Sequence, residues 1–196
     1  MIEFEGLLET FEQTIQTEEF KKFQKDFNES DNIFFIGNGG SHSVATHAAS
    51  DVSRLTPKKC FALDSASYLT SIANDFGYNN IFMKWLEDYA TEGSKSLVVG
   101  FSGSGNSKNV ISTLTLAHQD YNFKTCLLSG QPSNCVAPYV NEVIFNNRYF
   151  HVHEILCMLS FYQLIHGVGH SCPTIKDELI RKGHTESFRV KKHNKI

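Results

Sequence analysis

Apolar residues recur along the chain in two patterns, which predict strands alternating with helices. The run at residues 32–36 has no alternating polar positions, so a strand there is expected to be buried on both faces, as in a parallel sheet. Further strands are expected at 59–63, 96–101, 124–129 and 142–145. Helices are expected at 41–55, 66–73, 79–90, 107–119 and 149–167. This order predicts an α/β fold with a parallel sheet and right-handed crossovers.

The two ends of this pattern carry more apolar surface than one small domain needs. Residues 2–28 have apolar side chains at helical spacing, many of them phenylalanines, and predict one N-terminal helix. Residues 155–162, in the last predicted helix, are apolar almost all round. Such a helix needs cover on more than one side, so we expect a homo-oligomer, most simply a tetramer, with residues 1–30 taking part in its contacts.

Composition limits the class of protein. A chain of 196 residues with 41% apolar residues suits a single domain over 1–196, and a net charge of −3 argues against nucleic-acid binding by bulk charge. The basic end of the segment 174–196 is expected to be a solvated tail. No apolar run is long enough to span a membrane, and the acidic N-terminus does not resemble a signal peptide. The 5 cysteines, without a CxxC pair, favour a reduced, cytoplasmic setting.

Residues 100–107, GFSGSGNS, leave the strand at 96–101 and lead into a predicted helix. Glycines allow close backbone approach, and a helix N-terminus favours an anion. Ser102, Ser104 and Ser107 add hydroxyl groups, and the absence of a following lysine argues against a nucleoside triphosphate loop. A single phosphate monoester fits such a neutral cradle. The alternative is a flexible loop with Ser107 as helix cap.

A second glycine-rich turn, GNGGS at residues 37–41, follows the first strand. Two strand–glycine–helix turns of one parallel sheet can meet at one crevice, because ligands of open α/β sheets bind at the carboxyl ends of the strands. Together the two turns predict a binding site at that edge.

Three segments in this order resemble the sugar isomerase (SIS) domain family, nearest to its phosphoheptose isomerases: GNGGSHSVATHAASD (37–51), ANDFGYNNIF (73–82) and SGSGNSKNVI (102–111). The resemblance implies a single SIS-type domain with a five-stranded parallel sheet between helices. It also implies a homotetramer whose active sites are shared between subunits, and a sugar phosphate as the substrate.

The resemblance also implies roles for individual residues. It assigns phosphate binding to Ser102, Gly103, Ser104 and Ser107. It assigns the sugar to Asn38, Gly39, Gly40, Ser41 and Asp75. His47 stands where several members place a metal ligand, and Asp51 where members carry a catalytic glutamate or aspartate.

The last helix departs from the family pattern. The family has a glutamine at its start and a catalytic histidine eight positions later, where this chain has His151 and Leu159. His47 and Asp51 lie four apart and share a helix face. With His151 they would provide three zinc ligands and one open position, with Glu154 as a possible fourth ligand. Asp51 is then the expected base, and His151, His153 or Glu154 the acid.

These patterns favour an isomerase that interconverts sedoheptulose 7-phosphate and an aldoheptose 7-phosphate through an enediol, with Asp51 and His151 as catalytic residues and one zinc ion per subunit. The alternative is a non-catalytic relative that binds a phosphosugar, or a protein such as a replication initiator. Leu159 favours this alternative, whereas the His47–Asp51 pair favours the enzyme.

Overall fold

The computed structural model describes residues 4–175, which form one five-stranded parallel sheet in the order β2-β1-β3-β4-β5. The strands are β1 (Asn32–Gly37), β2 (Lys59–Ala62), β3 (Ser96–Ser102), β4 (Lys124–Ser129) and β5 (Asn141–Ile144). Every neighbouring pair is parallel, and the central pair aligns Asn32 with Ser96 and Gly37 with Phe101. The α/β fold and the parallel sheet expected from the apolar runs are confirmed.

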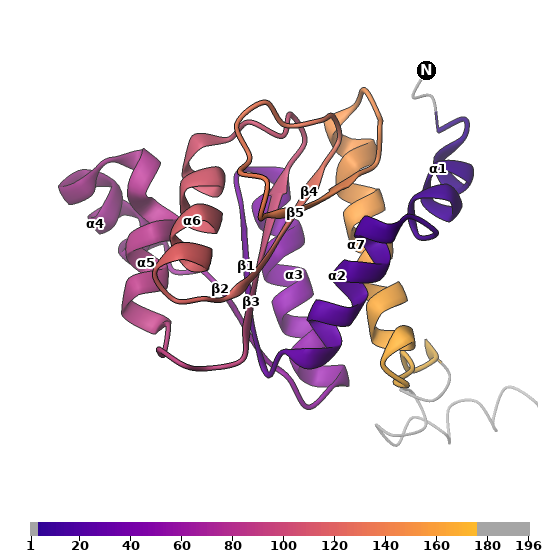
Figure 1. The fold of residues 1–196 in the computed structure, drawn as a ribbon, viewed down its shortest axis with the longest axis horizontal. Helices are drawn as coiled ribbons and strands as arrows, with labels where there is room; N and C mark the ends of the chain where they lie inside the picture. Colours follow the sequence, from indigo (N-terminus) through magenta and orange to yellow (C-terminus); the bar gives the residue numbers. More distant parts are fainter. Residues whose placement is uncertain (1–3, 176–196) are drawn as a thin grey trace, which may run out of the picture.

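Helices cover both faces of the sheet (Figure 1). They are α1 (Leu7–Thr14), α2 (Glu18–Glu29), α3 (Gly40–Leu55), α4 (Ala66–Phe76), the short 3-10 helix η1 (Tyr78–Asn80), α5 (Ile81–Tyr89), α6 (Lys108–Gln119) and α7 (Phe150–Gly167). In Figure 1, α2, α3 and α7 lie on one side of the sheet, and α4, α5 and α6 lie on the other.

Each face of the sheet has its own apolar core. Alternate residues of β1 separate the two, because successive side chains of a strand point to opposite faces: Ile33 and Phe35 pack with α2, α3 and α7, and Phe34 and Ile36 with α5 and α6. All of these side chains are buried. Residues 33–36 are apolar without alternation because helices cover both faces of β1, so side chains on both faces are buried.

The N-terminal segment differs from the single helix expected over residues 2–28. It forms α1 and α2, and the second helix is capped by Thr17, whose hydroxyl accepts a hydrogen bond from the Phe20 amide at 3.2 Å. Threonine with an extended backbone is a favoured N-cap, because it satisfies one of the free amides of the first turn. The apolar spacing continues across this break, which is why spacing alone did not reveal it.

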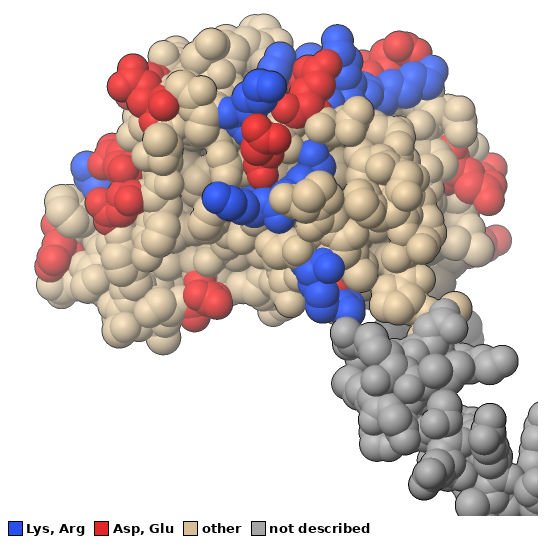
Figure 2. Space-filling model, turned by 90° about the horizontal axis from the view of Figure 1, so that it is seen from below, with Lys and Arg blue, Asp and Glu red and all other residues tan. Residues whose placement is uncertain are grey.

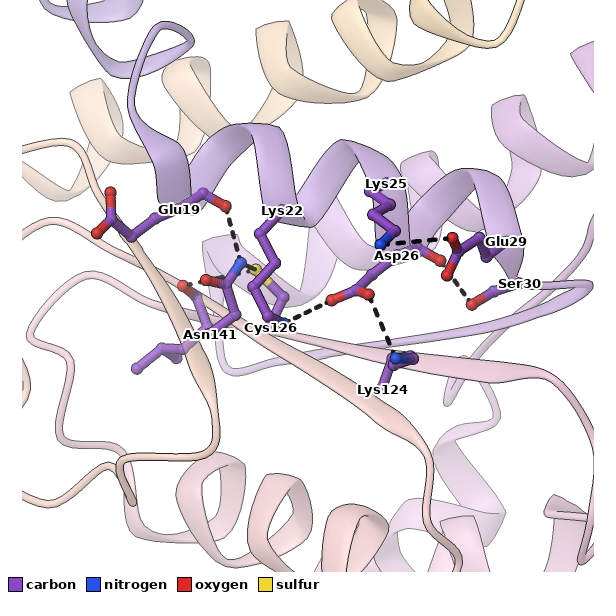
Figure 3. Close-up of polar contacts among 10 residues, drawn as sticks. Glu19, Lys22, Lys25, Asp26, Glu29, Ser30, Lys124, Cys126 and Asn141 are labelled. Carbon is purple, nitrogen blue, oxygen red and sulfur yellow. Dashed lines mark hydrogen bonds and ion pairs between the residues drawn. The ribbon is translucent and has the colours of Figure 1, made fainter.

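Polar contacts fix α2 to the edge of the sheet (Figure 3). The buried carboxylate of Asp26 pairs with Lys22 of the same helix at 2.7 Å and with Lys124 of β4 at 3.7 Å. The Asn141 side chain of β5 donates to the Glu19 carbonyl at 2.8 Å. These contacts orient α2, whose phenylalanines close the core beneath it.

The surface carries no single dominant charge on the side seen in Figure 2, where Lys and Arg mix with Asp and Glu. A nucleic-acid site would require a basic stripe or patch, and this face has none among residues 4–175. No helix of the described chain is long and apolar enough to cross a membrane. Of the expected tail at 174–196, residues 176–196 lie outside the described residues.

Candidate active site

The centre of the carboxyl edge of the sheet lies between β1 and β3, where the strand order reverses direction. β1 connects outward to β2, whereas β3 connects to β4 on the opposite side. The loops that follow two such strands separate and leave a crevice, which is the usual ligand site of open α/β sheets. The turns after β1 and β3 are the two glycine-rich segments singled out in the sequence, so both lie at this crevice.

The turn after β1 requires glycine at two positions. Gly39 has φ 57° and ψ −125°, a conformation that L side chains avoid, and it caps α3. At Gly37, a Cβ would lie 2.9 Å from the Ser41 carbonyl oxygen. Ser41 itself is buried. The turn thus brings the free amides at the start of α3 to the crevice.

The turn after β3 is held in shape by its own serines. The buried Ser102 hydroxyl donates to the Ser107 hydroxyl at 3.0 Å and accepts from the Ser107 amide at 3.3 Å. Asn106 links this turn to the loop after β4 by accepting from the Asn134 amide at 3.0 Å. Ser104 is exposed, and its hydroxyl accepts a 3.3 Å contact from the Asn106 amide. Ser102 and Ser107 therefore shape the loop, and Ser104 is available to a ligand.

An amide pair joins the two turns. Asn38 donates to Asn109 at 2.8 Å, and Asn109 donates back to Asn38 at 2.9 Å. The Tyr78 hydroxyl adds a 2.8 Å bond to the same Asn38 oxygen. Asn109 is 2% exposed and lies in the first turn of α6, so the pair fixes the start of α6 against the turn after β1. Neither Asn109 nor Tyr78 was predicted as a site residue, although both lie within the segments that carry the resemblance.

A hollow of about 630 Å³ opens beside the β3 turn. Backbone bonds join the loops around it, because the Gly130 amide donates to Gly103 at 3.1 Å and the Asn147 amide donates to Gly130 at 2.9 Å. Ser104 and Arg148 line the hollow together with Asn147, whose side-chain nitrogen is buried and has no hydrogen-bond partner within residues 4–175.

The first turns of α7 cover both glycine-rich turns. A Cβ on Gly103 would lie 2.7 Å from the Phe150 ring and 3.7 Å from the His153 ring. A Cβ on Gly40 would overlap the Glu154 carboxylate. His153 is buried, which lowers the pKa of its imidazole to about 4, so the ring is neutral at neutral pH. The start of α7 therefore places one imidazole at the β3 turn and one carboxylate at the β1 turn.

The predicted pair His47 and Asp51 does come together, about two to three turns further along α3. The His47 Nε2 lies 3.3 Å from the Asp51 Oδ2. Arg54 contacts the other carboxylate oxygen at 3.2 Å, and the Tyr162 hydroxyl donates to Oδ2 at 3.1 Å. The Asp51 carboxylate is thus engaged by a cation and a hydroxyl as well as by the imidazole.

The structure does not bring His151 to this pair. Its ring lies 6.1 Å from the Phe4 ring and 5.6 Å from the Tyr149 ring, measured between centroids. Tyr162, which contacts Asp51, follows His151 by eleven residues, or about 16 Å along a helix. No group of three or more His, Cys, Asp or Glu side chains within residues 4–175 is arranged to hold a metal ion. The three-ligand zinc site expected from the sequence is not formed by these residues.

Two other predicted residues occupy less central positions. Asp75 is exposed near the end of α4 and accepts a hydrogen bond from the neighbouring Asn74 at 2.8 Å. Leu159 is half-buried and lies three residues before Tyr162 on α7, at the position where the family pattern has a histidine. An aliphatic side chain there cannot bind a metal.

Comparisons with known proteins agree with this architecture. No protein-family model matches the chain. It is 33% identical over 160 residues to the phosphoheptose isomerase of Solidesulfovibrio magneticus, covering 74% of this chain and 76% of that protein. It is 37% identical over 112 residues to the Helicobacter pylori phosphoheptose isomerase, covering 54% of this chain and 57% of that protein.

Solved structures show the same fold. The phosphoheptose isomerase of Neisseria gonorrhoeae superposes with a TM-score of 0.74 at 21% identity, covering 84% of this chain and 94% of that one. The Francisella tularensis phosphoheptose isomerase gives a TM-score of 0.72 at 20% identity, covering 84% and 93%. The glycine-rich turns at the switch point, the sheet order and the first of these sequence matches lead to one conclusion: the chain belongs to the phosphoheptose isomerase family of sugar phosphate isomerases, with the SIS fold.

Proposed function

We propose that the protein interconverts sedoheptulose 7-phosphate and a D-glycero-heptose 7-phosphate through an enediol. The observation that carries the proposal is the meeting of two glycine-rich turns at the switch point of the sheet, in a chain of this family. One turn has the chemistry to hold a phosphate. The other presents an amide pair and helix amides suited to the hydroxyl groups of a sugar.

The phosphate end of the substrate is proposed to bind at the turn after β3. The start of α6 directs the positive end of its dipole there, and Ser104 supplies a free hydroxyl. Arg148 adds donors from the adjoining hollow. A phosphate held at one end orients the reacting carbons at the other, which is how a binding group without chemistry contributes to rate.

The remaining predicted substrate contacts lie at the turn after β1. Asn38 holds its amide at the crevice through the pair with Asn109, and Gly39, which has open space beside it, lets the substrate approach the backbone. Isomerisation requires a base, an acid and stabilisation of the developing oxyanion. Amides at the start of α3 are suited to the last of these tasks.

Zinc remains a prediction, and its predicted ligands fit only in part. His47 and Asp51 are adjacent and could provide two donors, but His151 contacts Phe4 and Tyr149 instead. We therefore derive no catalytic step through a metal. Metal analysis of the protein purified without chelator tests the prediction directly, with about one zinc per subunit expected if it holds.

A homo-oligomer is proposed from the apolar residues exposed on α1 and the start of α7. Leu8 of α1 is 65% exposed and Phe150 of α7 is 70% exposed, and Phe4, just before α1, and Ile155 of α7 are exposed as well. Exposed apolar side chains gathered in this way are typical of protein interfaces. Light scattering at micromolar concentration is expected to give the mass of a tetramer, and a monomeric mass would contradict the proposal.

The reaction is tested by incubating purified protein with sedoheptulose 7-phosphate, with added zinc and with chelator, and following the sugar by NMR. An aldoheptose 7-phosphate should accumulate to an equilibrium mixture. Binding without conversion under every condition would contradict the enzyme and favour the phosphosugar-binding alternative. Other ketose phosphates, tested in parallel, establish whether the substrate is a heptose.

A further inference from the structure

We propose that Glu154 is the carboxylate that moves the proton between C1 and C2 of the substrate. This inference rests on the proposed sugar phosphate isomerisation and assigns its acid–base step. The sequence patterns favoured Asp51 as base and left Glu154 as one of several acids. The surroundings of Asp51 and Glu154 in the structure favour Glu154, and not Asp51, as the base.

Glu154 lies at the crevice. It is in the first turns of α7, next to His153, which packs against Gly103 of the β3 turn. Its own carboxylate lies against Gly40 of the β1 turn. β1 and β3 are adjacent strands about 5 Å apart, so a sugar whose phosphate sits at the β3 turn extends toward Glu154 when it crosses to the β1 turn.

The Glu154 carboxylate is also unengaged. It is half-buried, yet it has no hydrogen bond or ion pair to any of residues 4–175. Asp51, in contrast, is engaged by the Arg54 guanidinium and by the Tyr162 hydroxyl. A half-buried carboxylate with no protein partner is free to contact a substrate.

Gly40 is the residue that allows this arrangement. The three atoms nearest to a Cβ built on Gly40 all belong to the Glu154 carboxyl group. The Gly40 backbone does not have a positive φ, so an alanine would be tolerated by the main chain. The backbone of the turn therefore does not require glycine at position 40. The Glu154 carboxylate occupies the space that a side chain at this position would fill.

The proposed step conserves atoms and electrons. The Glu154 carboxylate removes a proton from C1 of the ketose, and the electron pair of the broken C–H bond forms the C1=C2 double bond. The carbonyl oxygen on C2 takes up a proton from water, which gives the enediol. The Glu154 carboxyl group then returns its proton to C2, while the hydroxyl on C1 gives its proton back to water and becomes the aldehyde. No oxidant, reductant or cofactor is required.

The test compares Glu154→Gln with the wild type for turnover of sedoheptulose 7-phosphate and for its binding by calorimetry. Loss of a general base lowers turnover by about 100-fold or more, and the affinity should change less than about threefold because the phosphate is held elsewhere. Glu92→Gln, an exposed glutamate at the opposite edge of the sheet, is the matched control and should keep full turnover.

Gly40→Ala gives an independent test that leaves the carboxylate in the chain. Its Cβ should displace Glu154 and lower turnover at least tenfold, but it should have no further effect in a Glu154→Ala background. Turnover of Glu154→Gln above a third of the wild-type value, with the melting temperature unchanged, would overturn the assignment. Absence of turnover in the wild type would instead refute the proposed function itself.

Discussion

The reciprocal amide pair between Asn38 and Asn109 should be one of the strongest couplings in the site. The pair is joined by two hydrogen bonds, at 2.8 and 2.9 Å. Each such bond contributes about 1 kcal/mol net, so the pair should contribute about 2 kcal/mol to the free energy of unfolding. Because either single substitution removes both bonds, the two effects should not add.

The loss of stability expected for each variant depends on the hydrogen bonds that it removes and on how deeply they are buried. Asn38→Ala should lower the free energy of unfolding by about 2 kcal/mol, because the further bond from the Tyr78 hydroxyl is exposed and contributes little. Asn109→Ala should lower it by about 3 kcal/mol, because Asn109 is buried and its oxygen also accepts from the Val110 amide at 3.0 Å. The double variant should lose about 3 kcal/mol rather than the sum, which leaves a coupling energy of about 2 kcal/mol.

Urea unfolding followed by the fluorescence of Trp85 measures these values, since this is the single tryptophan and it is buried. Thr70→Ala, at an exposed hydroxyl on α4, serves as the control and should change stability little. Losses that add to within about 0.5 kcal/mol in the double variant would refute the coupling, and with it the view that this pair joins the two turns.

Three further predictions concern packing, ligand binding and thiol chemistry. Gly100→Ala should destabilise the fold by about 1–3 kcal/mol in urea unfolding, because its Cβ would lie 2.6 Å from a methyl group of α6; an unchanged midpoint would contradict this. Ser104→Ala with Ser107→Ala should weaken phosphosugar binding at least tenfold by calorimetry. In native protein Cys135, which is exposed, should react with a thiol reagent first, and Cys60, whose pKa burial raises to about 12, should react slowly.

The fold could be predicted from the sequence because its strands are buried on both faces. β1 and β3 read as unbroken apolar runs, and the glycine-rich turns that follow them mark the carboxyl edge. The break between α1 and α2 could not be predicted from spacing, since it depends on a single capping hydroxyl at Thr17. The spacing of apolar residues therefore predicts a helical segment, whereas the position of a capping side chain marks where a helix starts.

The site was predictable only in part, for a related reason. Helix spacing placed His47 beside Asp51, because both belong to α3. Contacts between helices depend on how α7 lies against α3, and spacing within one helix does not determine that. The tertiary packing places Tyr162 at Asp51 and Glu154 at Gly40, and leaves His151 against Phe4. The sequence shows that residue 40 has no side chain, but it does not show that the Glu154 carboxylate lies in the space beside it.

The most direct test of the central claim is hydrogen exchange at carbon during turnover. Sedoheptulose 7-phosphate is incubated with the protein in D₂O, and carbon-bound deuterium is followed by NMR. An enediol mechanism with a solvent-exchanging carboxyl base predicts deuterium at C2 of the aldose and, on return, at C1 of the ketose. Bound sugar phosphate that neither isomerises nor gains carbon-bound deuterium would contradict the account.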